Sequence, residues 1–204
     1  GDAVGYIVYH YNGVSWDSIG SVYGHSSTYL QHVNIAAASA PQLYSVAAYD
    51  SCMNVSNLGL NHTTLTSKST LDICRAAIDL RWNPYINMKD GVAQYNVYVS
   101  QDGGPYTFLA SVPPNNITYS HLTLQNGSVY CYYIQAQGVT GTRTSTSTLS
   151  CITANLLTEP AFSYLKRATV LDNRKVLVEC LVDTTNQPDV ARYKLQRSVD
   201  KNGP

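Results

Sequence analysis

The segment Val92–Gly104 has the sequence VAQYNVYVSQDGG. From Tyr95 to Val99 every second residue is apolar or aromatic, which is the period of a β-strand with one buried face. The segment then reaches Asp102-Gly103, a pair that favours the tight turn of a β-hairpin. It is therefore predicted to be a strand that opens a hairpin.

Two other segments repeat this pattern, residues 4–13 (VGYIVYHYNG) and residues 190–203 (VARYKLQRSVDKNG). The three copies begin at Val4, Val92 and Val190, which lie 88 and 98 residues apart. A spacing of this size corresponds to one β-sandwich module, so the chain is predicted to contain parts of three.

Segments that match the early strands of such a module occur in only two of the copies, at residues 78–84 and 176–182. The first copy is therefore expected to hold only the later strands of its module, and the last copy only the early strands. The expected domains are a partial module, a complete module and a second partial module, at residues 1–66, 67–155 and 156–204.

The composition agrees with an all-β chain. The sequence holds 17 Tyr but only 2 Phe, and aromatic and β-branched residues favour pleated, half-buried surfaces. Thirteen basic and thirteen acidic side chains give a net charge of zero, so neither nucleic acid nor a membrane surface is an expected partner. No apolar run reaches the length of a membrane-spanning helix, so membrane insertion is not expected.

Several segments, in this order along the chain, resemble the strands of fibronectin type III domains: Leu80-x-Trp82-x-Pro84, Tyr95-x-Val97-Tyr98 with Asp102-Gly103-Gly104-x-Tyr106, and Leu124-x-x-Gly127-x-x-Tyr130-x-Tyr132-x-Ile134-x-Ala136. The resemblance implies an immunoglobulin-like β-sandwich. The core residues that it implies are Leu80, Trp82, Tyr95, Val97, Tyr132 and Ile134.

The same resemblance implies a tyrosine corner, in which a Tyr at the start of the sixth strand bonds through its hydroxyl to the backbone a few residues upstream. Tyr130 is the expected corner residue of the complete module, and Tyr44 is the expected one in the first copy.

A narrower resemblance links residues 48–56, 80–85 and 130–136 to modules of very large surface or gliding-associated proteins of Bacteroidota-type bacteria. It implies export to the cell surface and O-glycosylation at Asp-Ser/Thr-apolar sites, here Ser18 and Thr184. Two surface turns are the simpler explanation of these tripeptides.

The five cysteines include no Cys-x-x-Cys pair and no His at zinc-finger spacing, so zinc is not expected. Cys131 and Cys151 lie at the two ends of a predicted hairpin centred on Gly141, which places them opposite each other and makes them the disulfide candidate. Cys180 falls in the register of a buried strand and is expected to be a packed thiol.

The sequence contains no pattern typical of an active site, a cofactor site or a metal site, so no enzyme is expected. His32 and His121 occupy similar places in the repeat, which suggests a structural role at the surface. Tyr133 and Tyr98 would form an aromatic patch for a protein or glycan, although pairing between neighbouring strands explains them equally well.

The function expected from these observations is that of a non-enzymatic spacer or adhesion segment of a large exported, multi-module cell-surface protein. A glycan- or protein-binding module and an accessory module of a secreted glycoside hydrolase remain alternatives. The expected partners are neighbouring modules and a surface glycan or protein. A second copy of the chain is a further expected partner, because residues 156–204 supply the early strands that residues 1–66 lack.

Overall fold

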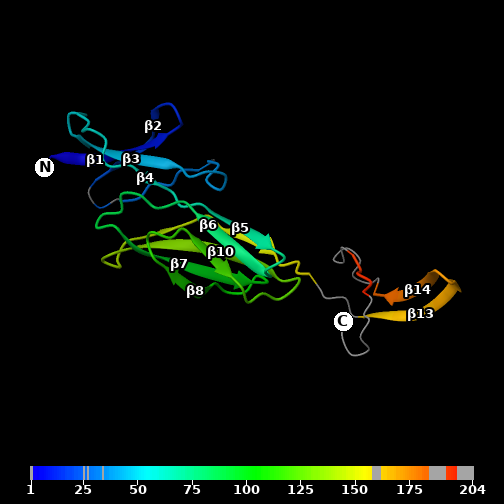
Figure 1. The fold of residues 1–204 in the computed structure, drawn as a ribbon. Helices are drawn as coiled ribbons and strands as arrows, with labels where there is room; N and C mark the ends of the chain where they lie inside the picture. Colours follow the sequence, from blue (N-terminus) through cyan, green and yellow to red (C-terminus); the bar gives the residue numbers. More distant parts are fainter. Residues whose placement is uncertain are drawn as a thin grey trace. The chain divides into compact units, whose positions relative to one another are not determined.

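The structure is a computed structural model, and it describes residues 2–24, 26, 28–33, 35–157, 162–183 and 192–196. The described residues form fourteen β-strands and no helix, which confirms the all-β fold class (Figure 1). The chain divides into two compact units, residues 1–155 and residues 156–204. Among the described residues, no helix is long and apolar enough to cross a membrane.

The first unit begins with a four-stranded antiparallel sheet in the order β2-β1-β3-β4. Its strands are β1 (Ala3–Tyr11), β2 (Trp16–Tyr23), β3 (Leu43–Asp50) and β4 (His62–Thr63). The repeated segment at residues 4–13 therefore supplies a central strand, β1, as its alternating pattern predicts.

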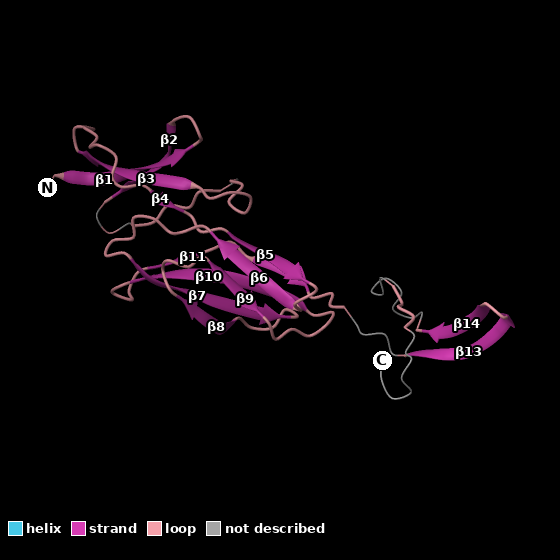
Figure 2. Ribbon diagram, in the orientation of Figure 1, coloured by secondary structure: helices cyan, strands magenta, loops and turns pink. Residues whose placement is uncertain are grey.

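The rest of the first unit is a sandwich of two antiparallel sheets (Figure 2). One sheet has the order β5-β6-β9, with β5 (Ser67–Asp72), β6 (Ala77–Trp82) and β9 (Thr118–His121). The other has the order β11-β10-β7-β8, and β12 also pairs with β10. Its strands are β7 (Val92–Gln101), β8 (Thr107–Val112), β10 (Val129–Gly138), β11 (Thr144–Thr146) and β12 (Ser150–Thr153).

The core of the sandwich lies between these two sheets. In β10 burial follows the strand period of two, whereas β7 buries Tyr95, Asn96 and Val97 in succession. The Trp82 ring packs edge-on against the Tyr95 ring, with 5.5 Å between centroids. The structure buries all six residues expected in the core, Leu80, Trp82, Tyr95, Val97, Tyr132 and Ile134.

The turn between β7 and β8 shows why its sequence needs Asp-Gly. Asp102 and Gly103 have φ values of 50° and 76°, so both residues adopt the left-handed conformation that tight hairpin turns require. The Asp102 side chain adds a second function, because its carboxylate accepts a hydrogen bond of 2.8 Å from the Val129 N–H. That backbone bond is the main reason why the pKa of Asp102 lies below its usual value.

The edge strand opposite β10 differs from the expectation. The hairpin predicted around Gly141 implies one continuous strand that reaches Cys151, but the structure divides this strand into β11 and β12. Thr148, in the gap, bonds across to the other sheet, donating its N–H to the Leu65 carbonyl at 3.2 Å and accepting from Ser67. Hydroxyl side chains therefore join the two sheets at the place where the edge strand is interrupted, between Thr146 and Ser150.

Equivalent strand positions pair in the same way in the first sheet and in the sandwich, but one face of the first sheet is open. Val8 pairs with Val46 as Val97 pairs with Ile134. Ile134 is fully buried, whereas Val46 is 43% exposed. Among the described residues, no second sheet covers the Val46 face.

The described residues of the second unit include a hairpin of β13 (Ser163–Asp172) and β14 (Lys175–Val182). Cys180 is exposed on β14. This corrects the expectation of a packed thiol, because a two-stranded hairpin has no opposing sheet to cover its apolar face. Most of the third repeated segment, residues 190–203, lies outside the described residues.

Candidate functional site

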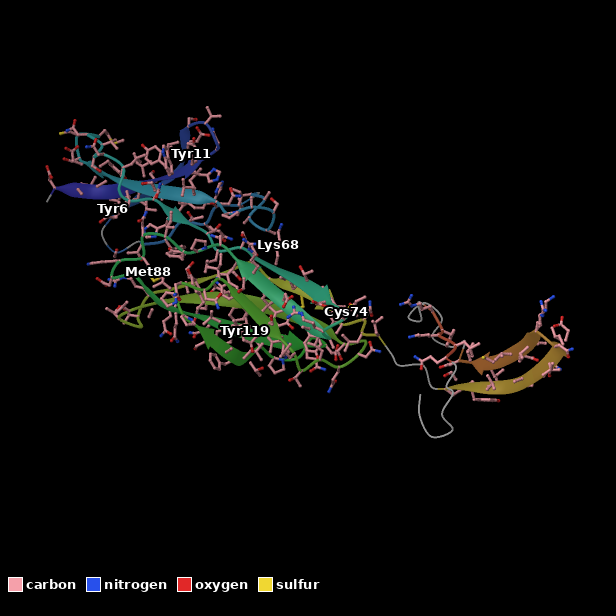
Figure 3. All side chains as sticks on the ribbon, viewed as in Figure 1. Tyr6, Tyr11, Lys68, Cys74, Met88 and Tyr119 are labelled. Carbon is pink, nitrogen blue, oxygen red and sulfur yellow. A yellow bond between two sulfur atoms is a disulfide. The ribbon has the colours of Figure 1, made fainter. Side chains whose placement is uncertain are left out.

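The disulfide candidate of the sequence is a bond in the structure. Cys131 of β10 and Cys151 of β12 face each other in the strand register, and their sulfur atoms are 2.05 Å apart. The bond joins the edge strand to a central strand of the same sheet. The cysteines outside this bond, Cys52, Cys74 and Cys180, are free and exposed, and Cys74 lies in the turn that follows β5 (Figure 3).

Tyr130 has the geometry of a tyrosine corner. Its ring is buried, and its hydroxyl accepts a hydrogen bond of 2.8 Å from the backbone N–H of Gln125, five residues upstream. This bond fixes the connection that leads into β10, since the N–H would otherwise lack a partner in the sandwich.

Tyr44 does not form the expected corner. His10 pairs with Tyr44 as Val99 pairs with Tyr132, so Tyr44 occupies the place of Tyr132. Its hydroxyl lies 2.9 Å from Nδ1 of His32. The place of Tyr130 is taken by Gln42, two residues earlier, which explains why the first sheet has no corner at this position.

A His–Tyr pair occurs at equivalent places of the sandwich and of the first sheet. Nδ1 of His121 lies 2.9 Å from the Tyr132 hydroxyl inside the sandwich, as Nδ1 of His32 does from Tyr44 in the first sheet. Burial lowers the pKa of His121 and raises that of Tyr132. Both side chains are therefore neutral at physiological pH, and the pair is a buried hydrogen bond.

His121 therefore has a structural role in the core, not at the surface as its sequence suggested. The equivalent places of His32 and His121 in the repeat were the signal for the pair. The tyrosine partners do not follow from the sequence, because Tyr44 resembles Tyr130 locally although its strand pairing is that of Tyr132.

Residues that connect the first sheet to the sandwich are held by side chains of the loop after β6. Asn83 donates to the Thr64 carbonyl at 3.1 Å and accepts from the Thr66 N–H at 2.7 Å. Asn87 donates to the Asn61 carbonyl at 2.7 Å. Together these bonds satisfy backbone groups before and within a junction only three residues long, between Thr63 and Ser67.

Two further contacts strengthen this junction. The Tyr85 hydroxyl lies 3.1 Å from Nδ1 of His62, the first residue of β4. Leu65, at the centre of the junction, is buried. The junction is thus packed and hydrogen-bonded as the interior of a domain is, and unlike a flexible linker.

An aromatic cluster lies on the outer face of the larger sheet. Tyr98 and Tyr133 are register partners on β7 and β10, and their rings stack with centroids 4.7 Å apart. Tyr106 contacts Tyr133 at 5.0 Å, and Phe108, which is 58% exposed, contacts Tyr98 at 5.9 Å. Cross-strand pairing explains Tyr98 and Tyr133, and a role for the cluster in binding stays a prediction.

The predicted modification sites differ in what the structure describes. Ser18 is exposed on the edge strand β2, opposite Tyr9, and thus lies on a strand instead of in a surface turn. Thr184 lies outside the described residues. Among the residues that are described, no group of three or more His, Cys, Asp or Glu side chains is placed to hold a metal ion.

No protein-family model matches the chain, and no curated protein matches it. Among solved structures, an Fn3-like protein from Clostridium thermocellum is 28% identical, with a TM-score of 0.36, over 42% of this chain and 83% of that one. Pectate lyase PelI from Erwinia chrysanthemi is 16% identical, with a TM-score of 0.37, over 43% of this chain and only 28% of the lyase.

The FN1–FN3 domains of chicken CNTN1 are 13% identical, with a TM-score of 0.32, over 74% of this chain and 57% of that one. These TM-scores are below 0.5, so the fold is assigned from the strands themselves. A sheet of the first, second and fifth strands, β5-β6-β9, faces a sheet built on the third and sixth strands, β7 and β10. By this arrangement, the sandwich of residues 67–153 is an all-β fold of the fibronectin type III kind.

Proposed function

We propose that this chain is a non-enzymatic spacer segment of a large exported protein, in which β-sandwich modules follow one another through rigid junctions. The observation that carries the proposal is the junction between β4 and β5, where Asn83, Tyr85 and Asn87 hold the connecting residues through hydrogen bonds. A row of modules joined in this way keeps its ends apart, whereas flexible linkers would let it collapse.

Two other features support the proposal. The first sheet repeats the strand register of the sandwich, as tandem modules of one design would. The Cys131–Cys151 disulfide fits an oxidising compartment, and hence the cell-surface location and the Bacteroidota-type surface proteins that the sequence resembles. The three domains expected at residues 1–66, 67–155 and 156–204 are part of this proposal.

The proposal is tested by the relative motion of the two parts of the first unit. In ¹⁵N relaxation of the full chain, amides of β1 and β3 should report the same rotational correlation time as amides of β7 and β10. Asn83→Ala should separate the two values, because it removes the hydrogen bonds to Thr64 and Thr66.

Asn116→Ala is the matched control, since the Asn116 side chain bonds only within its own loop, to Thr118. It should leave both correlation times unchanged. Different correlation times for the two parts in the unmodified chain would contradict the rigid junction and with it the spacer function.

A further inference from the structure

The sandwich has a pair of facing cations on the outer side of its smaller sheet. Lys68 on β5 is the direct register partner of Arg81 on β6 (Lys68 is labelled in Figure 3). Like charges directly opposite each other on neighbouring strands destabilise a sheet. Among the described residues, no carboxylate lies within ion-pair distance of either side chain.

The acidic residue next along the strand does not relieve this repulsion. Asp79, two residues before Arg81, is engaged by the Arg75 guanidinium and accepts a hydrogen bond of 2.5 Å from the Ser120 hydroxyl. Arg75 also pairs with Asp72 at 2.7 Å, so both carboxylates of this face are directed to Arg75, and neither forms an ion pair with Lys68 or Arg81.

The last hairpin shows the arrangement that the same strand positions adopt without this conflict. Cys180 of β14 aligns with Trp82, so Glu179 stands at the place of Arg81. Glu179 forms ion pairs with Lys166 at 2.8 Å and with Arg167 at 2.6 Å. Arg81 of the sandwich thus stands at the position where the last hairpin has Glu179, a carboxylate that pairs with two cationic side chains.

Lys68 and Arg81 also line a common hollow of about 480 Å³, which is within the usual range for small-ligand sites. None of its other lining residues is acidic, and Thr70 supplies a hydroxyl group. The Asn83 amide and the Thr66 hydroxyl also line it, and they bond to each other at 3.0 Å.

We propose that this hollow is a binding site for a carboxylate-bearing glycan, with Lys68 and Arg81 holding the carboxylate of one sugar unit. The two facing cations supply the charge-assisted hydrogen bonds that a carboxylate accepts. The Thr70 hydroxyl beside them can bond a hydroxyl of the sugar ring. This activity is separate from the spacer role, although the hollow borders the junction through Asn83 and Thr66.

Alginate, a polymer of uronic acids, is the probe for the full chain, with dextran as the neutral polymer. Isothermal titration at low salt should show binding to alginate, weaker binding at higher salt, and none to dextran. Arg81→Glu should weaken alginate binding at least tenfold. The same variant should melt at a higher temperature than the natural chain, because it places a carboxylate opposite Lys68, as Glu179 stands opposite Arg167 in the last hairpin.

Lys166→Ala is the control, because it removes a lysine of the last hairpin that is already paired with Glu179. It should leave alginate binding unchanged. The proposal is overturned if Arg81→Glu binds alginate as tightly as the natural chain, or if the natural chain binds no alginate. Tighter binding to dextran sulfate would instead assign the hollow to sulfate groups, and tighter binding to polyglutamate would assign it to acidic peptides; either result refutes the carboxylate-bearing glycan.

Discussion

Ile134 lies at the centre of β10 and is completely buried between the two sheets of the sandwich. Ile134→Ala removes three carbon atoms, each worth about 0.8 kcal/mol of burial, and leaves a cavity that the packed core fills only in part. We therefore expect the free energy of unfolding to fall by about 3–4 kcal/mol.

Val129 of the same strand provides the matched control, because it is 40% exposed. Val129→Ala removes two carbon atoms from a partly solvated site, so the expected loss is about 1 kcal/mol. Urea unfolding followed by Trp82 fluorescence, in a Trp16→Phe background, isolates the signal of the sandwich. Equal losses for Ile134→Ala and Val129→Ala would refute the two-sheet core.

Val46 is the register equivalent of Ile134 in the first sheet, and its face is open. Val46→Ala should therefore cost about 1 kcal/mol, measured as a small increase in amide exchange of β3. A cost as large as that of Ile134→Ala would mean that another sheet covers this face in solution. That sheet would be supplied by a second copy of the chain if the effect depended on concentration.

Three further predictions concern the sandwich, all measured as urea midpoints. Burial lowers the pKa of His121, so this side chain resists protonation in the folded protein. The free energy of unfolding should therefore hold above about pH 6.5 and fall as the pH drops below that value. The fall should be less steep in His121→Gln. Replacing Cys131 and Cys151 by Ser opens a loop of 20 residues and should cost about 3 kcal/mol, and a loss near zero would contradict the cross-link. Removing the corner hydroxyl by Tyr130→Phe leaves the Gln125 N–H unpaired and should cost about 1–2 kcal/mol, whereas an unchanged midpoint would rule the corner out as a stabilising contact.

Much of this fold is predictable because its strands alternate cleanly. Tyr95, Val97, Tyr132 and Ile134 stand at every second position, so their inward direction follows from the period of the strand. The cysteine pair is predictable for a related reason, since a hairpin turn at Gly141 determines which residues stand opposite each other.

The features that could not be predicted depend on pairings between segments far apart in the sequence. Tyr44 resembles Tyr130 locally, and only its pairing with His10 shows that it occupies the place of Tyr132. The junction depends likewise on Asn83, a residue that in sequence resembles any loop asparagine. Its bonds to Thr64 and Thr66 span 19 and 17 residues and follow no local pattern.

The Cys131–Cys151 bond has a consequence for a chain that is pulled from its ends. Tension that enters at Asn155 travels along β12 only to Cys151, crosses the sulfur bridge to Cys131, and bypasses the 20-residue loop between them. That loop would otherwise add about 70 Å of contour length when the sandwich unravels. The bond therefore makes the extension of such a module shorter under load, so that the row of modules proposed above would lengthen in smaller steps.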